Sequence, residues 1–487
     1  MKSKYLLLLL PFILLFTTVC RSHSEVISKV YFQCSVDSLL TGTRKRLAAS
    51  FNETGIQYWK KGNYGKAAEN FKKSADLGYS WGQYSLSLCF WYGKGEKKDL
   101  NEAIKWILLA SNQGNADALN HLGYVYQAGV GIEKDYLKAL KYFSKAAEMG
   151  HVEAQGSIGY LYQYGLGVDP NYEEARKWYL LAAQQGNATA QGSIGQLYAA
   201  GLGVKPDYKE AIKWYQLAAN QSYVPIYSYL GDLFKDGLGV NKNYDEALIW
   251  YKKSAKSGNA RGILQLGLMY EYGYGVASSY TEALKRYKEA YERGELNALV
   301  QIGRVYEKGL NGIPNYDEAI KWYRLAADKG SASGQYHLGN SYYYGRGLTL
   351  DYVEAMKWYR LAVKQDNPEG ALGLGLLYGE GNGTEKDCYQ ALKWFLLAAE
   401  KDNSEGSYQA YKVYYYCLTD TKNAFKYLTT AVNQQHPDAI FELAEAYYLG
   451  LLGLSVNIQK AHELYVKAAE SGNILAKNAL QVKGFNL

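Results

Sequence analysis

The stretch AQGSIGYLYQYGLGV, residues 154–168, returns 36 positions later as AQGSIGQLYAAGLGV, residues 190–204. Each copy ends in Gly-x-Gly-Val, a glycine-rich pattern that could also cradle a phosphate. With these two, copies of the unit begin at residues 82, 118, 154, 190, 226, 262, 298, 334 and 370 without a gap, and degenerate copies begin at 406 and 439. A fixed period of this length predicts a stack of similar supersecondary units.

Both halves of the unit have the apolar spacing of a helix. Residues 154–164 place apolar side chains at i, i+4, i+7 and i+8, and residues 172–185 do the same with Ala, Trp-Tyr and Ala-Ala. Small residues let helices approach closely, and the aromatic rings fill the space beside them. We therefore expect an all-α fold, a right-handed α-solenoid of antiparallel helix pairs with a 36-residue repeat.

The start of the second helix carries a repeated polar residue. This column reads Asp99, Asp135, Asn171, Asp207, Asn243, Ser279, Asn315, Asp351 and Asp387, and Glu or Gln follows three residues later in eight of the nine units. This spacing is that of a capping box, in which the two side chains satisfy free amides of the first turn. We interpret the acidic column as helix capping and not as a metal or catalytic array.

The copy number also decides between the two interpretations of Gly-x-Gly. A phosphate loop is needed once, whereas the pattern recurs at Gly93/Gly95, Gly129/Gly131, Gly165/Gly167, Gly201/Gly203, Gly237/Gly239, Gly273/Gly275, Gly345/Gly347 and Gly381/Gly383. Glycine permits the left-handed conformation that ends a helix and reverses the chain. The sequence thus predicts a turn of the scaffold.

The first residues resemble an export signal. Lys2 and Lys4 precede an apolar run from Tyr5 to Val19, which is shorter than the roughly 20 residues of a spanning helix. We expect residues 1–24 to be a signal peptide, with an uncleaved membrane anchor as the alternative. The protein is then secreted, periplasmic or in the lumen of the endoplasmic reticulum.

The charge balance argues against some partners. The formal net charge is +7, of which Lys2, Lys4 and Arg21 contribute three, and no run of five Lys or Arg occurs. The remaining excess is too small for a chain of this length to indicate binding of nucleic acid or of an anionic membrane surface.

Four cysteines follow the expected signal. Cys89 falls in a core position of a predicted helix and reads as a buried thiol. Cys388 and Cys417 lie in neighbouring units, where a disulfide is one possibility that spacing alone does not settle. Asn52, Asn187, Asn220 and Asn382 begin N-x-S/T sequons, which we expect in loops or in the leader.

The pattern A-x-x-x-L/I-G-x-L-Y-x-x-G-x-G-V, followed by D/N-x-x-E-A-x-x-W-Y-x-x-A-A-x-x-G, resembles the Sel1-like repeat family, a branch of the tetratricopeptide superfamily. The resemblance covers residues 82–475. Residues 55–81 look like a plain tetratricopeptide hairpin, residues 25–54 like an exposed connector, and residues 476–487 like a C-terminal capping helix.

No catalytic, metal or cofactor motif interrupts the repeats: the six histidines do not cluster, and H-E-x-x-H, G-x-S-x-G and P-loop patterns are missing. The resemblance implies a non-enzymatic scaffold that binds partner proteins, in a bacterial envelope or in the endoplasmic reticulum. Some secreted relatives bind or hydrolyse β-lactams but carry a cysteine pair in each repeat, which this chain lacks. A hydrolase of that type and a purely structural envelope component are the alternatives, and neither a small-molecule substrate nor a cofactor is expected.

Tyrosine is the outlier of the composition, with 50 residues against 12 phenylalanines. Many occupy the repeated core columns, but six lie on first helices at positions that vary between units: Tyr160, Tyr164, Tyr272, Tyr336, Tyr343 and Tyr344. First helices line the concave surface of such solenoids, and tyrosine offers rigid apolar area with a polar tip. We expect these residues to contact a protein partner, the alternative being that they only pack between neighbouring units.

Overall fold

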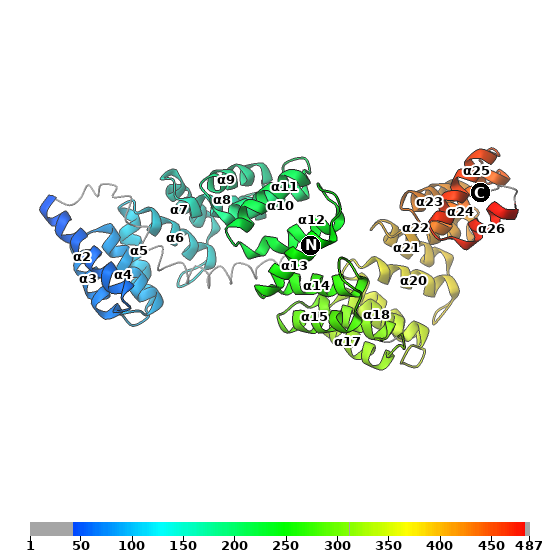
Figure 1. Cartoon of the computed structure of the whole chain (residues 1–487), viewed down its shortest axis with the longest axis horizontal. Coiled ribbons are helices and arrows are strands. Elements are labelled where there is room, and N and C mark those ends of the chain that lie inside the picture. Colours follow the sequence, from blue (N-terminus) through cyan, green and yellow to red (C-terminus); the bar gives the residue numbers. More distant parts are fainter. Residues whose placement is uncertain (1–41, 311, 483–487) are drawn as a thin grey trace. The chain divides into compact units, whose positions relative to one another are not determined.

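The computed structural model describes residues 42–310 and 312–482. All regular structure in these residues is helical, and consecutive helices form antiparallel pairs (Figure 1). The expected α-solenoid of helix pairs with a 36-residue repeat is confirmed. The chain divides at Asn259 and Ala260 into two compact units.

The first unit contains α2 Gly42–Lys60, α3 Tyr64–Asp76, α4 Ser80–Tyr92, α5 Leu100–Asn112, α6 Ala116–Ala128, α7 Tyr136–Glu148, α8 Val152–Tyr164, α9 Tyr172–Gln184, α10 Ala188–Ala200, α11 Tyr208–Asn220, the 3-10 turn η3 Val224–Ile226, α12 Tyr227–Asp236 and α13 Tyr244–Lys256. Even-numbered helices are the first helices of their pairs, and odd-numbered helices are the second.

The second unit contains α14 Ala260–Tyr272, α15 Tyr280–Glu292, α16 Asn297–Lys308, α17 Tyr316–Asp328, α18 Ala332–Tyr344, α19 Tyr352–Val363, α20 Pro368–Glu380, α21 Cys388–Ala399, α22 Ser404–Lys412, the π-helical turn η4 Val413–Cys417, α23 Thr421–Asn433, α24 Pro437–Leu449, α25 Ile458–Glu470 and α26 Ile474–Val482. The pairing order is the same as in the first unit.

The Gly-x-Gly turns adopt the predicted conformation. Gly165 ends α8 with φ 64°, and its N–H donates to the carbonyl of Leu161. Gly167 is required for a second reason, because a Cβ there would lie 2.7 Å from Cβ of Tyr136, the first residue of α7 in the preceding pair. The first glycine reverses the chain and the second lets the turn contact its neighbour.

The capping column is confirmed in part. Each of the nine predicted N-caps accepts a hydrogen bond from the amide three residues on, as Asn171 does from Glu174 at 3.0 Å. The return bond of a capping box is not made here, because the N–H of Asn171 already donates to the carbonyl of Tyr162. The Glu174 carboxylate instead pairs with Lys177 at 2.9 Å. The hydrogen bond from the N-cap amide to Tyr162 therefore also joins the second helix of the pair to the first.

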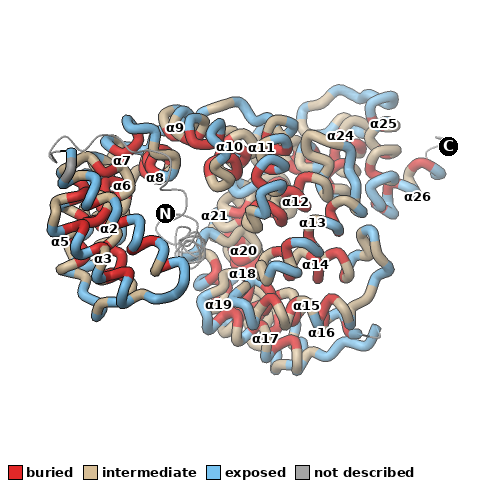
Figure 2. Tube along the Cα trace, turned by 60° about the vertical axis from the view of Figure 1, so that its left-hand side comes forward, coloured by how far each residue is buried: buried red, intermediate tan, exposed pale blue. Residues whose placement is uncertain are grey.

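The core of most pairs is an aromatic ring, usually of tyrosine, against a glycine. A Cβ on Gly159 would lie 2.7 Å from the ring of Tyr179, which is 3% exposed. The same contact recurs along the chain, and the tyrosines of the Tyr179 column are fully buried at residues 215, 251, 287, 323 and 359. Figure 2 shows the buried residues where paired helices face each other. Hydrophobic burial at these contacts holds the pairs together.

First helices also contact one another across pairs. Direct packing joins α16 to α18, α18 to α20 and α20 to α22, whereas second helices in the described residues make no contact of this extent. From α16 to α22 the stack is therefore tighter on the side of its first helices, which makes that side the inner one there.

The N-terminal boundary differs from the expectation. We expected a connector to residue 54, but residues 42–54 belong to α2, which packs on α3. A Cβ on Gly55 would lie 2.5 Å from the Phe71 ring, the same contact as in the regular pairs. Asn52 is buried in α2 and not in an exposed leader, and Asn220 ends α11.

The expected signal peptide, residues 1–24, lies outside the described residues. Among the helices that are described, none combines the length and the apolar character needed to cross a bilayer.

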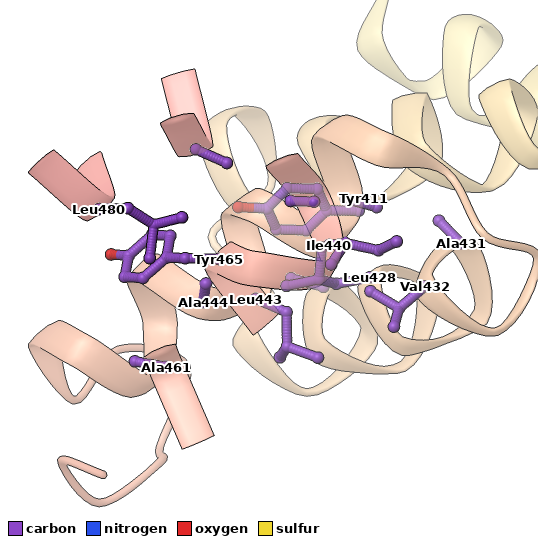
Figure 3. Packing of buried hydrophobic residues seen from close by; sticks show 14 residues of the cluster. Tyr411, Leu428, Ala431, Val432, Ile440, Leu443, Ala444, Ala461, Tyr465 and Leu480 are labelled. Atoms are coloured by element: carbon purple, nitrogen blue, oxygen red, sulfur yellow. The ribbon is translucent and has the colours of Figure 1, made fainter. Parts of the chain in front are cut away.

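The pair made by α22 and α23 departs from the repeat. In place of a Gly-x-Gly turn it has η4, whose last residue, Cys417, forms a disulfide with Cys388. Cys388 is the first residue of α21 and occupies the column that Tyr136 and Tyr352 hold in regular pairs. The disulfide thus joins neighbouring pairs at the place where, in regular pairs, the second glycine of the turn contacts the first residue of the preceding second helix. Beyond it, α22–α26 share one core that includes Leu428, Ile440 and Tyr465 (Figure 3).

Candidate functional site

Two of the six candidate tyrosines lie in the first unit, on α8. The rings of Tyr160 and Tyr164 are 4.6 Å apart, and both side chains are half-buried. Burial raises the pKa of Tyr160 to about 12, so its hydroxyl is neutral at physiological pH. The two rings form a local pair at the end of α8.

The other four lie in the second unit, on α14 and α18. Tyr272 and Tyr344 are 43% and 52% exposed. Tyr336 and Tyr343 are half-buried and approach the Tyr359 ring, with centroids 6.1 and 6.5 Å away. The six candidates are thus divided between the two units, and Tyr272 and Tyr344 have the most free ring surface.

Buried tyrosines reach polar side chains of the first helices through their hydroxyl groups. Tyr287 donates to Glu271 and Tyr323 donates to Glu307, both at 2.7 Å. Burial raises the pKa of both tyrosines well above the usual range, and the nearby carboxylates add to this effect. Each hydroxyl therefore stays protonated and holds a carboxylate against the core.

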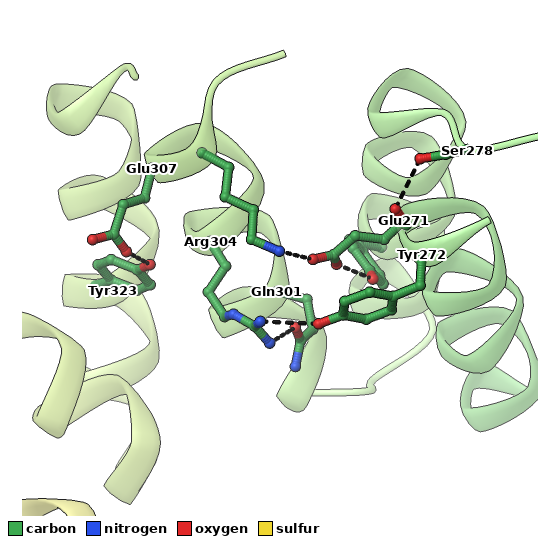
Figure 4. A network of polar contacts seen from close by, with 9 residues as sticks. Glu271, Tyr272, Ser278, Gln301, Arg304, Glu307 and Tyr323 are labelled. Carbon is green, nitrogen blue, oxygen red and sulfur yellow. Dashed lines mark hydrogen bonds and ion pairs between the residues drawn. The ribbon is translucent and has the colours of Figure 1, made fainter. Parts of the chain in front are cut away.

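Cations cover these carboxylates from the outside. Glu271 has a fully buried side chain and pairs with Lys308 of α16 at 2.7 Å (Figure 4). Arg346, which follows α18, pairs with Glu307 at 3.0 Å and lies over the Tyr344 ring, 4.7 Å from its centroid. Both carboxylates are thus satisfied from two sides, and the cations are the more exposed partners.

Arg304 of α16 is different, because its two hydrogen bonds go to uncharged oxygens. One N–H donates to the hydroxyl of Tyr272 at 3.0 Å and another to the amide oxygen of Gln301 at 2.9 Å (Figure 4). We call Tyr272, Arg304, Lys308, Tyr344 and Arg346 the charged face; all lie on or directly after α14, α16 and α18.

Tyr272 and Tyr344 of the charged face are among the residues predicted from the sequence, whereas its three cations are not. A signal existed, because Arg304 is the only cation in its column across the nine regular units, where the other positions are Leu88, Tyr124, Tyr160, Gln196, Asp232, Leu268, Asn340 and Leu376. A column whose residue type varies between the units of a regular repeat indicates a position that core packing does not constrain.

His121 and His337 occupy the same column of the repeat but lie in different units. His121 contacts Tyr84 and Trp91, and His337 stacks on the Tyr323 ring with centroids 4.7 Å apart. Burial lowers the pKa of His337 to about 4. In residues 42–310 and 312–482, no three His, Cys, Asp or Glu side chains are grouped as metal ligands.

The helix pairs define an α-solenoid repeat protein. The Sel1 repeat family matches residues 46–79, 82–115, 116–151, 152–187, 188–223, 227–259, 260–295, 296–331, 332–367, 368–403 and 437–473. The chain belongs to the Sel1 repeat family. The stretch between the last two matches, residues 404–436, is the pair that carries η4 and the disulfide.

The chain is similar to solved structures of repeat proteins. The chain is 32% identical to c5321, a protective antigen of uropathogenic Escherichia coli with an SLR fold, and the alignment covers 86% of this chain and 91% of that one with a TM-score of 0.55. It is 33% identical to a Sel1 repeat protein of Oxalobacter formigenes over 50% of this chain and 96% of that one, with a TM-score of 0.46.

Curated relatives are similar over a short segment. The mouse DAP3-binding cell death enhancer 1 is 43% identical over 58 residues, which are 12% of this chain and 11% of the mouse protein. The rat protein of the same name is 41% identical over the same length. The chain thus spans about a tenth of these relatives.

Proposed function

We propose that the chain is an exported, non-enzymatic scaffold that binds partner proteins along the face of its first helices. The observation that carries this proposal is the contrast between constant and variable columns. The core glycine and tyrosine recur from pair to pair, whereas the column of Tyr272 reads Tyr164, Ala200, Asp236, Tyr272, Lys308, Tyr344 and Glu380. Packing accounts for the constant columns and leaves the variable ones free to recognise a partner.

The geometry of the stack supports the choice of face. From α16 to α22 first helices contact each other across pairs, and Arg304 of α16 donates a hydrogen bond to Tyr272 of α14. Their side chains therefore gather on the inner side, where an extended partner meets several pairs at once. Tyr272 and Tyr344 present exposed rings there. Rigid aromatic side chains of this kind contribute strongly to protein interfaces.

The disulfide supports export. Disulfides persist in oxidising compartments and are rare in the cytosol. Cys388 and Cys417 are joined, whereas Cys89 is a buried free thiol whose pKa is raised to about 12 by burial and which is therefore unreactive. Together with the apolar N-terminal segment, the disulfide favours secretion, the periplasm or the endoplasmic reticulum.

Partner capture with matched variants tests the proposal. The purified protein should retain specific proteins from an extract of the organism that carries it, and the double variant Tyr272→Ala, Tyr344→Ala should lose most of them. Tyr389→Ala on α21 is the control, because Tyr389 is 74% exposed but lies on a second helix. Equal loss with the control, or no loss with the double variant, would contradict the proposal.

A further inference from the structure

We propose that the charged face binds an acidic segment of a protein partner, whose Asp or Glu side chains meet Arg304 and Arg346 while Tyr272 and Tyr344 pack beside it. This inference rests on the proposed scaffold function and adds the chemistry of the partner. It is carried by three observations on α14, α16 and α18 and on Arg346, which directly follows α18.

The guanidinium of Arg304 has no carboxylate among its hydrogen-bond partners. It donates to Tyr272 and Gln301, both uncharged, and a guanidinium has five N–H donors. The remaining donors suit a further acceptor. Arginine forms its strongest hydrogen bonds with carboxylates, in a planar two-pronged geometry that neutral oxygens do not match.

The acidic groups of this region are turned inward. The side chain of Glu271 is fully buried, and that of Glu307 is 28% exposed, against 38% for Lys308 and 46% for Arg346. Each carboxylate also accepts a hydrogen bond from a buried tyrosine. A partner approaching this face therefore meets cations before anions, although the two kinds of charge nearly balance in number.

Aromatic rings flank the cations. The Lys308 ammonium lies 5.2 Å from the centroid of the Tyr272 ring, and Arg346 covers the Tyr344 ring. These contacts hold the long cationic side chains in place before binding, which reduces the entropy lost when a partner docks. The face ends toward α20, where Glu380 accepts a hydrogen bond from Tyr343 at 2.5 Å.

The charge of this face is local. The equivalent positions of α8 and α10 hold Tyr160, Tyr164, Gln196 and Ala200, none of which is ionised at neutral pH. The acidic partner segment is therefore expected to bind the second unit and not the first.

Fluorescence anisotropy with defined peptides tests the inference on the full chain. The probes are three labelled peptides of alternating glycine with glutamate, glutamine or lysine, at low ionic strength. We expect the glutamate peptide to bind at least tenfold more tightly than the other two, and its binding to weaken as salt is added. Equal binding of the glutamine or lysine peptide would overturn the proposal.

Single charge removals locate the binding. Arg304→Gln and, separately, Arg346→Gln should each weaken binding of the glutamate peptide by about fivefold to tenfold, about 1–1.4 kcal/mol, while circular dichroism stays unchanged. Lys321→Gln is the matched control, because this lysine of α17 is exposed and pairs with Glu318 on the second helix. An effect of the control as large as that of both variants would overturn the proposal.

The two proposals can fail separately. If the glutamate peptide does not bind but Tyr272→Ala, Tyr344→Ala still abolishes partner capture, the acidic chemistry is wrong and the scaffold function stands. If partner capture is insensitive to those tyrosines, the scaffold function on this face is wrong, whatever the peptides do.

Discussion

At the scale of single residues, two glycines of α8 have opposite roles. Gly159 is in contact with the Tyr179 ring, whereas a Cβ on Gly156 would meet no atom within 4 Å. Neither glycine has a positive φ, so both backbones accept alanine. The glycine of Gly159 recurs eight times in its column of the repeat, whereas the position of Gly156 varies.

Gly159→Ala should therefore destabilise the protein, by roughly 1–3 kcal/mol, because the new methyl group overpacks the core against Tyr179. Gly156→Ala in the same helix should leave the stability unchanged or raise it by about 0.5–1 kcal/mol, since alanine is the better helix former. Urea unfolding followed by circular dichroism measures both. Similar destabilisation by the two variants would contradict the glycine–tyrosine packing.

His337 gives a pH-dependent contribution to stability. Burial lowers its pKa in the folded protein to about 4, from an ordinary value of 6.5, although Glu307 acts in the opposite direction. Between pH 6.5 and 4 the unfolded chain binds the proton more readily than the folded one, so this histidine makes the free energy of unfolding fall as the pH falls.

The variant His337→Asn should therefore lose less stability than the wild type between pH 6.5 and 4. His151 acts in the opposite sense, because Asp117 and Glu153 raise its pKa despite its burial, so the comparison uses the difference between variant and wild type. Thermal unfolding at several pH values measures this difference. If the stability difference between variant and wild type were the same at every pH from 6.5 to 4, His337 would not be a buried neutral histidine.

At the scale of helices, the sequence predicted the glycine turns and the N-caps of the regular pairs. It did not predict the irregular pair α22–α23 with its π-helical turn. The second helix starts where its Asp or Asn column predicts, since that side chain accepts the amide three residues on. The expected hydrogen bond from the N-cap amide to the Glu side chain is not made, because this amide donates to a carbonyl of the first helix. Such a contact between helices does not follow from the local spacing of residues. The disulfide likewise needed the arrangement of two neighbouring pairs to become evident.

Removing the disulfide should loosen the C-terminal pairs selectively. In Cys388→Ala, Cys417→Ala we expect α22–α26 to lose about 2–4 kcal/mol of protection, since the crosslink restrains the unfolded chain and joins α21 to η4. Amide hydrogen exchange resolved by segment measures the loss, with α14–α18 as the internal control. Unchanged exchange in α22–α26 would show that the core of these helices suffices alone.

At the scale of the whole molecule, the repeat made most of the fold predictable, because each pair depends on its neighbours and on few distant residues. The site was predictable only in part. Tyr272 and Tyr344 are exposed as a docking role requires, but Tyr336 and Tyr343 pack on Tyr359, and the role of Arg304 depends on partners that lie on two different helices. Side-chain contacts of that kind follow from three-dimensional packing and not from periodicity.

The division at Asn259 and Ala260 predicts that each unit folds without the other. A fragment of residues 260–487 should be helical and unfold cooperatively in urea, because its pairs bury their cores on one another. Circular dichroism of the isolated fragment measures this. A fragment without cooperative unfolding would show that the second unit needs the first.

Site-specific photo-crosslinking in the organism that carries the chain tests the central claim most directly. A photoreactive residue at position 272 or 344, on the first helices, should crosslink a partner protein, and at position 321 or 389, on second helices, it should not. Mass spectrometry identifies the crosslinked protein and its segment. Partners captured equally from both sides, or from the second helices alone, would contradict docking along the face of the first helices.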